Sequence, residues 1–161
     1  MSSKLSHTNV SFGFLNNSSE FLNCIINNIN SCVIMLNNKM ELQAYNDALT
    51  TIFNDKPEEE ILYKRCGEVI GCAYQIEESK DCGTTSHCNT CELRLTAINT
   101  YMNDAPVYKQ YISRPFYNTE MNRVQKHLQC SIKLFRFESE KYIVLLIEDI
   151  TELIDLKSCC E

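Results

Sequence analysis

The apolar positions near the start of the chain have the three- and four-residue spacing of an amphipathic helix. They are Phe21, Leu22, Ile25, Ile26 and Ile29. Ser18 and Ser19 stand directly before them, and serine is a good helix N-cap. We therefore predict a helix that begins at one of these serines, preceded by a polar, non-periodic arm over residues 1–17.

Strand patterns follow in two groups. Residues 32–36 form a β-rich run, residues 41–45 alternate between apolar and polar, and the intervening "NNK" predicts a turn, so this segment indicates a hairpin. Three more strands are expected near residues 107–113, 128–137 and 141–149. In the middle one, apolar side chains alternate with Gln, Ser and Lys, which is the period of a half-buried strand.

Helical spacing fills the remaining segments. We expect short helices over residues 46–54 and 58–63, and a longer one over residues 91–102 with Leu95, Ile98 and Met102 on one side. A last helix follows residue 149. The order predicts an α+β fold, namely a five-stranded antiparallel sheet with helices on one face and flanking helices at both ends.

The composition agrees with one soluble domain, which we place at residues 18–156 with a tail over residues 157–161. The chain has 161 residues, of which 44% are apolar and 22% charged, enough for an ordinary core. The net charge of −6 argues against a nucleic-acid surface. The longest apolar run, "YIVLLI", is far shorter than the roughly 20 residues of a membrane span. The N-terminus lacks the apolar core of a signal peptide, so we expect a cytoplasmic protein without membrane contact.

Three stretches together resemble a PAS sensor domain. They are residues 31–53, which lead through a hairpin into "N-x-A"; residues 64–71, "KRCGEVIG"; and residues 142–156, where "D-I-T-E" follows an apolar strand. The resemblance implies a PAS-like fold, a sensory role, and a structural and signal-relaying part for Asp149 and Glu152. No kinase core follows residue 161, so we expect signalling through a partner protein such as a kinase, with the flanking helices as homodimer or partner contacts.

Four of the ten cysteines gather within an insert over residues 66–91, at the spacing C-x9-C-x5-C-x2-C. They are Cys72, Cys82, Cys88 and Cys91. A C-x-x-C pair at a helix start can place two sulfurs on one metal, and clustered cytosolic cysteines are commonly ligands or redox thiols. We predict a four-cysteine metal site, which both Zn²⁺ and an iron–sulfur cluster accept, and the spacing does not choose between them. The segment also resembles a cysteine-rich subset of PAS domains in bacterial sensor kinases, through its "G-x-x-x-G-C", "C-G-T-T" and "C-x-x-C" motifs.

Other interpretations of the thiols stay open. Cys88 and Cys91 could be a redox pair, the four could be unlinked, and a disulfide framework is disfavoured in the cytoplasm. His87 is expected to face solvent or to support a ligand, because its neighbour Cys88 makes joint ligation awkward. For Cys66, the sequence does not decide between a role in core packing and a role as a spare ligand.

Two cofactors known from PAS domains fit the residues poorly. The surroundings of Cys66 and Cys72 do not resemble those of the light-sensing flavin proteins, and His87 sits among thiols and not beside an apolar pocket as a haem ligand would. Three of the remaining cysteines are expected to be buried, namely Cys24, Cys32 and Cys130. Two more, Cys159 and Cys160, lie on the C-terminal tail.

The sequence therefore supports a hypothesis of function with two alternatives. The preferred one is a single-domain PAS-type sensory module that responds to redox state or oxygen through the metal or iron–sulfur site. The alternatives are an interaction module with structural zinc and a thiol oxidoreductase using Cys88 and Cys91. With no serine triad, G-x-S-x-G or phosphate loop in the chain, we do not expect an enzyme.

Overall fold

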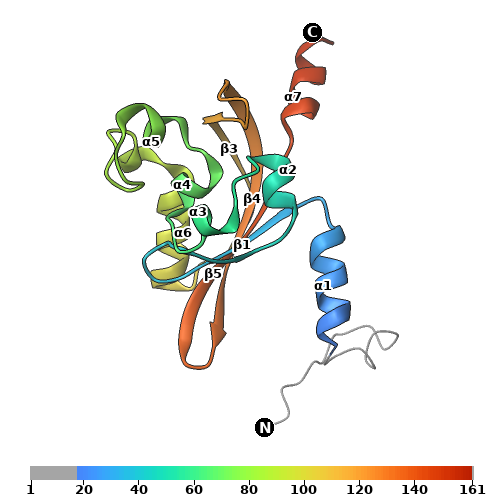
Figure 1. Ribbon diagram of the computed structural model, residues 1–161, viewed down its shortest axis with the longest axis vertical. Helices are drawn as coiled ribbons and strands as arrows, with labels where there is room; N and C mark the ends of the chain where they lie inside the picture. The colour runs from blue at the N-terminus through green and yellow to red at the C-terminus, as the bar shows by residue number, and fades with distance from the viewer. Residues whose placement is uncertain (1–17, 161) are drawn as a thin grey trace.

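The computed structural model describes residues 18–160 and is built on a five-stranded antiparallel sheet, which confirms the predicted fold class. The strands lie in the order β2-β1-β5-β4-β3 (Figure 1). Their bounds are Cys32–Leu36 for β1, Leu42–Tyr45 for β2, Val107–Tyr117 for β3, Arg123–Phe137 for β4 and Glu140–Asp149 for β5. The last three strands begin earlier or run longer than the sequence pattern predicted.

Alternation along the strands gives the sheet one fully buried face. The largest buried strand side chains are Ile34, Leu36, Leu42, Ile112, Phe116, Leu128, Ile132, Ile143, Leu145 and Ile147. Burying each such side chain stabilises the fold by about 1.5–3 kcal/mol relative to leaving it in water. Glu138 and Ser139, with φ of 47° and 70°, form the tight turn that joins β4 to β5.

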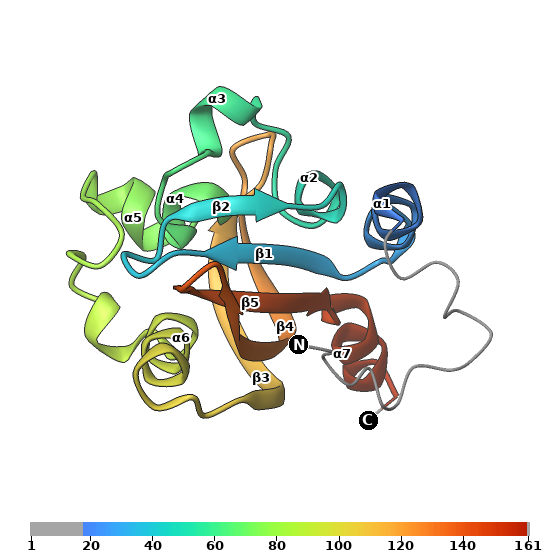
Figure 2. The same cartoon turned by 90° about the horizontal axis from the view of Figure 1, so that it is seen from below.

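Short helices cover the buried face and line the region of the cysteines. They are α2 Ala48–Ile52, α3 Glu58–Ile61, α4 Cys66–Ile70, α5 Ala73–Glu78, the 3₁₀ turn η2 Cys88–Thr90 and α6 Glu92–Asn103. The sequence pattern did not predict α4 and α5. Figure 2 shows α4, α5 and α6 grouped together beside the sheet.

The buried side of α6 differs from the apolar stripe that the sequence pattern showed. Leu95 and Met102 are 45% and 69% exposed, and the helix instead buries Leu93, Ala97 and Thr100. The small side chains of Ala97 and Thr100 allow α6 to approach the sheet closely, and Thr100 Oγ1 donates a 2.9 Å hydrogen bond to the Ala105 carbonyl.

Two further helices flank the sheet. They are α1 Ser19–Asn28, whose N-cap Ser18 accepts a hydrogen bond from the Phe21 N–H as expected, and α7 Thr151–Ser158. In both views α1 and α7 lie on the opposite side of the molecule from α4, α5 and α6 (Figures 1 and 2). Within residues 18–160 no helix is both long and apolar enough to cross a bilayer. The predicted arm over residues 1–17 lies outside the described residues.

The cysteines outside the insert divide as follows. Cys32 and Cys130 are fully buried in the sheet, as predicted. Cys24 is exposed, so its predicted burial is wrong, because α1 packs none of its residues fully into the core. Cys159 and Cys160 are exposed at the end of α7.

Candidate functional site: a cavity lined by thiols

A cavity of about 330 Å³ lies between the α4–α6 region and the buried face of the sheet. Its apolar wall is made by strand and helix side chains such as Leu36, Ile112 and Leu93. Five cysteines line the same cavity: Cys66, Cys72, Cys82, Cys88 and Cys91. The four predicted site cysteines therefore surround one space, joined by Cys66, whose role the sequence left open.

Cys72 is held against the edge strand β3. It stands between α4 and α5, and its backbone forms a bridge to Phe116. The preceding Gly71 has φ of 75°, and its carbonyl accepts a 2.8 Å hydrogen bond from the Tyr117 N–H. A Cβ on Gly71 would come within 2.8 Å of the Tyr117 carbonyl oxygen, so only glycine fits this link between the cysteine region and the sheet.

Cys82 packs against the first turn of α4. Its Sγ accepts a 3.3 Å hydrogen bond from the Gly67 N–H, and its carbonyl accepts a 2.7 Å bond from the Arg65 guanidinium. A Cβ on Gly67 would stand only 2.8 Å from this sulfur. Burial raises the pKa of Cys82 to about 11, against the opposing effect of the Gly67 hydrogen bond.

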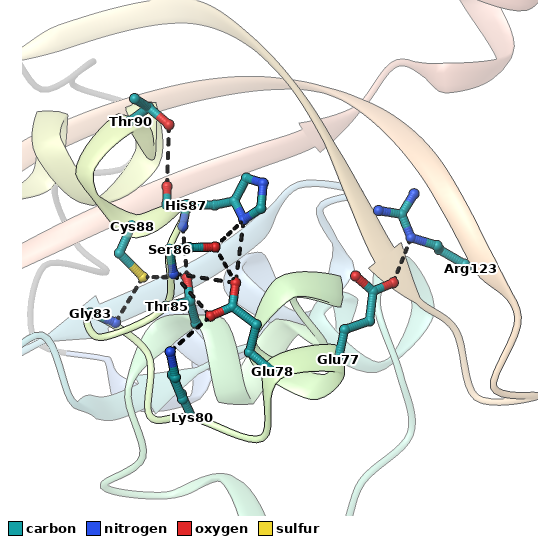
Figure 3. Close-up of polar contacts among 10 residues, drawn as sticks. All are labelled: Glu77, Glu78, Lys80, Gly83, Thr85, Ser86, His87, Cys88, Thr90 and Arg123. Carbon is teal, nitrogen blue, oxygen red and sulfur yellow. Dashed lines mark hydrogen bonds and ion pairs between the residues drawn. The ribbon is translucent and has the colours of Figure 1, made fainter.

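Cys88 stands in an environment that favours its thiolate form. Burial opposes the thiolate, but Sγ lies 2.9 Å from Thr85 Oγ1 and accepts a 3.1 Å bond from the Gly83 N–H (Figure 3). Together with the nearby charge of Arg94, these contacts lower the pKa of Cys88 below its ordinary value. The thiolate is the form that binds metals and attacks electrophiles.

The environments of Cys91 and Cys66 disfavour the thiolate form. Cys91 is the N-cap of α6, and burial raises its pKa although the Arg94 N–H and the charge of Arg114 act in the other direction. Burial, followed by the charges of Cys82 and Cys91, raises the pKa of Cys66 well above the usual range. Without a bound cation, Cys66 therefore stays a neutral thiol.

A polar clamp fixes the loop that carries Cys88. Glu78 accepts hydrogen bonds from the Ser86 N–H at 3.0 Å and from the Ser86 hydroxyl, and these lower the pKa of Glu78 to about 2 (Figure 3). The exposed His87 ring stacks on Tyr74 with ring centres 3.6 Å apart. The loop is thereby attached to α5 on the outside while its sulfur faces the cavity.

The positions of the thiols around the cavity limit which metal centre they can bind. Among residues 18–160, no three His, Cys, Asp or Glu side chains stand close enough together to hold one metal ion. A tetrahedral Zn²⁺ needs four thiolates about 2.3 Å from one centre. An iron–sulfur cluster places several atoms between its cysteine ligands, so thiols spread around a cavity fit it better. The assignment of Cys72, Cys82, Cys88 and Cys91 as ligands stays a prediction.

The solved structures similar to this one include PAS domains and a light-oxygen-voltage receptor. A PAS domain from a two-component sensor histidine kinase aligns with a TM-score of 0.50 and 10% identity over 81% of this chain and 94% of its own. The PAS domain of a Colwellia psychrerythraea protein gives a TM-score of 0.53 and 8% identity over 83% and 97%. An RNA-binding light-oxygen-voltage receptor gives 0.56 and 12% over 96% of this chain but 37% of its own. No protein-family model and no curated protein matches the chain. The chain has a PAS fold.

Sequence reasoning missed the arginines of the site. Arg65, Arg94 and Arg114 line the cavity from the start of α4, from α6 and from β3. Arg65 precedes Cys66 directly and Arg94 follows Cys91 by three residues, so adjacency to the cysteines was a usable signal for those two. Arg114 had none, because only the folded sheet brings it to the cavity.

Proposed function

We propose that this chain is a PAS-type sensory or regulatory module in which Cys72, Cys82, Cys88 and Cys91 hold an iron–sulfur cluster that responds to redox state or oxygen. The observation that carries the proposal is that all four thiols line one cavity between the helices and the sheet. Bound there, a cluster would supply a centre that gains or loses one electron. We propose no catalytic activity for the chain.

The chain's own residues offer a route by which the cavity can influence the sheet. Cys72 is paired with Phe116 and Gly71 is hydrogen-bonded to Tyr117, so a displacement of Cys72 bears directly on β3. From β3 the ladder continues through β4 to β5, and β5 leads into α7. The output is proposed to be a change at α7.

The partner is proposed to be another protein of a signalling system, such as a kinase, and the working form a cytoplasmic homodimer. The similarity in fold to a PAS domain of a two-component sensor histidine kinase supports the first part. Exposed apolar side chains on both flanking helices support the second, for example Leu22 on α1 and Leu153 on α7, at 56% and 61% exposed. Apolar patches of this kind commonly mark protein contacts.

Two other functions have support of their own. A structural zinc uses the same four thiols, although they would need to draw together around one ion. A thiol oxidoreductase is favoured by the lowered pKa of Cys88, with Cys91 one helical turn away as the second thiol.

Anaerobic purification with analysis of iron, acid-labile sulfide and zinc separates these proposals. We expect stoichiometric iron and sulfide and a brown protein. Cys72→Ser is expected to abolish the colour, whereas Cys24→Ser, at an exposed cysteine of α1, leaves it unchanged. Zinc without sulfide would favour the structural site. A metal-free protein that reduces disulfides, and that loses this activity in Cys88→Ser but not in Cys72→Ser, would favour the oxidoreductase.

A further inference from the structure

The cavity that gathers the thiols is also strongly cationic. Arg65, Arg94 and Arg114 are each half-buried in its wall, and among the described residues none of the side chains lining it is acidic. No ion pair formed within residues 18–160 involves any of these three arginines. Guanidinium groups in the wall of a cavity, with no carboxylate partner among the described residues, favour an anion in the space that they line.

The side chains of Arg65 and Arg94 both lie against Gly83. A Cβ placed on Gly83 would stand 3.3 Å from Arg94 Nε and 3.4 Å from Arg65 Nη1, so both guanidinium groups lie against this glycine. Arg65 also donates to the Cys82 carbonyl. Two like charges packed on the residue between the Cys82 sulfur and the Cys88 loop repel each other, and an anion in the cavity would relieve that repulsion.

The third arginine approaches from the sheet. Arg114 lies on β3, lines the cavity and holds its guanidinium 5.3 Å from the centre of the Tyr74 ring. Arg94 lines the same cavity from α6. The positive charges therefore stand on both the helical and the sheet side of the thiols.

We propose that Arg65, Arg94 and Arg114 are the charge partners of an anionic, thiolate-ligated centre in this cavity, and that they favour its reduced, more negative state. The inference rests on the proposed function. When a reductant such as dithionite gives one electron to the centre, the net charge becomes more negative by one, and no bond is made or broken. Fixed positive charges nearby stabilise that product and so raise the reduction potential.

Arg94 offers the sharpest test because its charge can be removed or kept. Arg94→Gln removes the charge and Arg94→Lys keeps it. Arg136→Gln is the matched control, since Arg136 is exposed on β4 and pairs with Asp104 outside the cavity lining. Iron and sulfide content, and the midpoint potential from an anaerobic titration followed by electron paramagnetic resonance, are measured for the wild type and each variant.

We expect Arg94→Gln to shift the midpoint potential to more negative values, Arg94→Lys to stay near the wild type, and Arg136→Gln to leave it unchanged. Loss of the centre in Arg94→Gln but not in Arg94→Lys would also support the inference, through affinity. A fully loaded Arg94→Gln protein with the wild-type potential would overturn the inference and leave the proposed function intact. Loss of the centre in both Arg94 variants, with unfolding seen by circular dichroism, would assign Arg94 a structural role only and likewise overturn it. A wild-type protein that takes up neither iron nor sulfide would overturn both.

Discussion

Gly67 lies within α4, and its importance comes from the sulfur beside it. Its backbone is helical, so alanine would ordinarily be the better residue there by roughly 0.5–1 kcal/mol. Here a Cβ would meet the Cys82 sulfur at 2.8 Å and the Cys72 Cβ at 3.4 Å. The position of one cavity thiol therefore depends on the absence of a side chain on the neighbouring helix.

Gly67→Ala is expected to destabilise the metal-free protein by about 1–3 kcal/mol, the usual cost of overpacking. In a Cys82→Ala background the tightest contact is gone, so the same substitution should cost clearly less. Urea unfolding of the four proteins of this cycle measures the coupling between the two positions. Equal costs in both backgrounds would show that the sulfur does not constrain Gly67.

At the scale of single residues, the sequence was sufficient to identify the cysteines of the candidate site but not the residues around them. The spacing of Cys72, Cys82, Cys88 and Cys91 predicted a shared site, and these cysteines line one cavity, while their role as ligands stays a prediction. The close contact at Gly67 and the arrival of Arg114 were not predictable, because each depends on elements separated in the chain that meet only after folding.

The junction of β5 and α7 is fixed by a small group of polar residues. Asp149 accepts hydrogen bonds from the Thr151 N–H and hydroxyl, and its carboxylate lies 2.6 Å from Lys126 Nζ. The Thr151 hydroxyl in turn accepts from the His127 N–H at 3.0 Å. The first turn of α7 is thus attached to the neighbouring strand β4, which gives the sheet a defined contact with its exit helix.

Asp149→Asn is expected to loosen this junction, with a loss of about 1 kcal/mol because the group is partly exposed. Although burial acts in the opposite direction, Lys126 and Thr151 hold the pKa of Asp149 below its ordinary value. The stabilisation is therefore present at neutral pH and lost as the pH falls from the ordinary aspartate pKa through the lowered one. Urea unfolding against pH, with amide exchange in α7, should show this acid-dependent part in the wild type and not in the variant.

Asp155→Asn serves as the control, because Asp155 is an exposed aspartate further along the same helix. It should leave both the stability and its acid dependence unchanged. If Asp149→Asn behaved like this control, the polar group would not hold α7 to the sheet.

Helices and strands were predictable to the extent that their own sequence pattern, and not packing against distant segments, determines them. The strands followed from period-two alternation, since each buries one face of a single sheet. The apolar stripe of α6 did not reveal its buried side, because the buried positions include the small Ala97 and Thr100, which carry little hydrophobic signal. The short helices α4 and α5 were missed because each is only five or six residues long, which is too short for a helical period to show in the sequence.

The candidate site and the flanking helices lie on different sides of the molecule. The thiols and arginines lie with α4, α5 and α6, while α1 and α7 lie across the molecule (Figures 1 and 2). The flanking helices expose Leu22, Ile25, Leu153 and Leu156, between 47% and 65% each. The outer face of the sheet adds Leu146 and Phe135 at 40% and 45%. Apolar side chains exposed on two flanking helices are unfavourable in water, and a second copy of the chain is a partner that would cover them.

The double substitution Leu153→Glu and Leu156→Glu is expected to convert a homodimer into a monomer, because pairing would bury four carboxylates against apolar side chains. Sedimentation velocity over a range of concentrations measures the change. Leu95→Glu is the matched control, since Leu95 is 45% exposed on α6, across the molecule from α1 and α7. It should leave the dimer intact. A wild-type protein that stays monomeric at every concentration would contradict pairing through the flanking helices. A Leu95 variant that dissociates just as fully would contradict it too. In either case the exposed face of α7 would be a contact for a different protein.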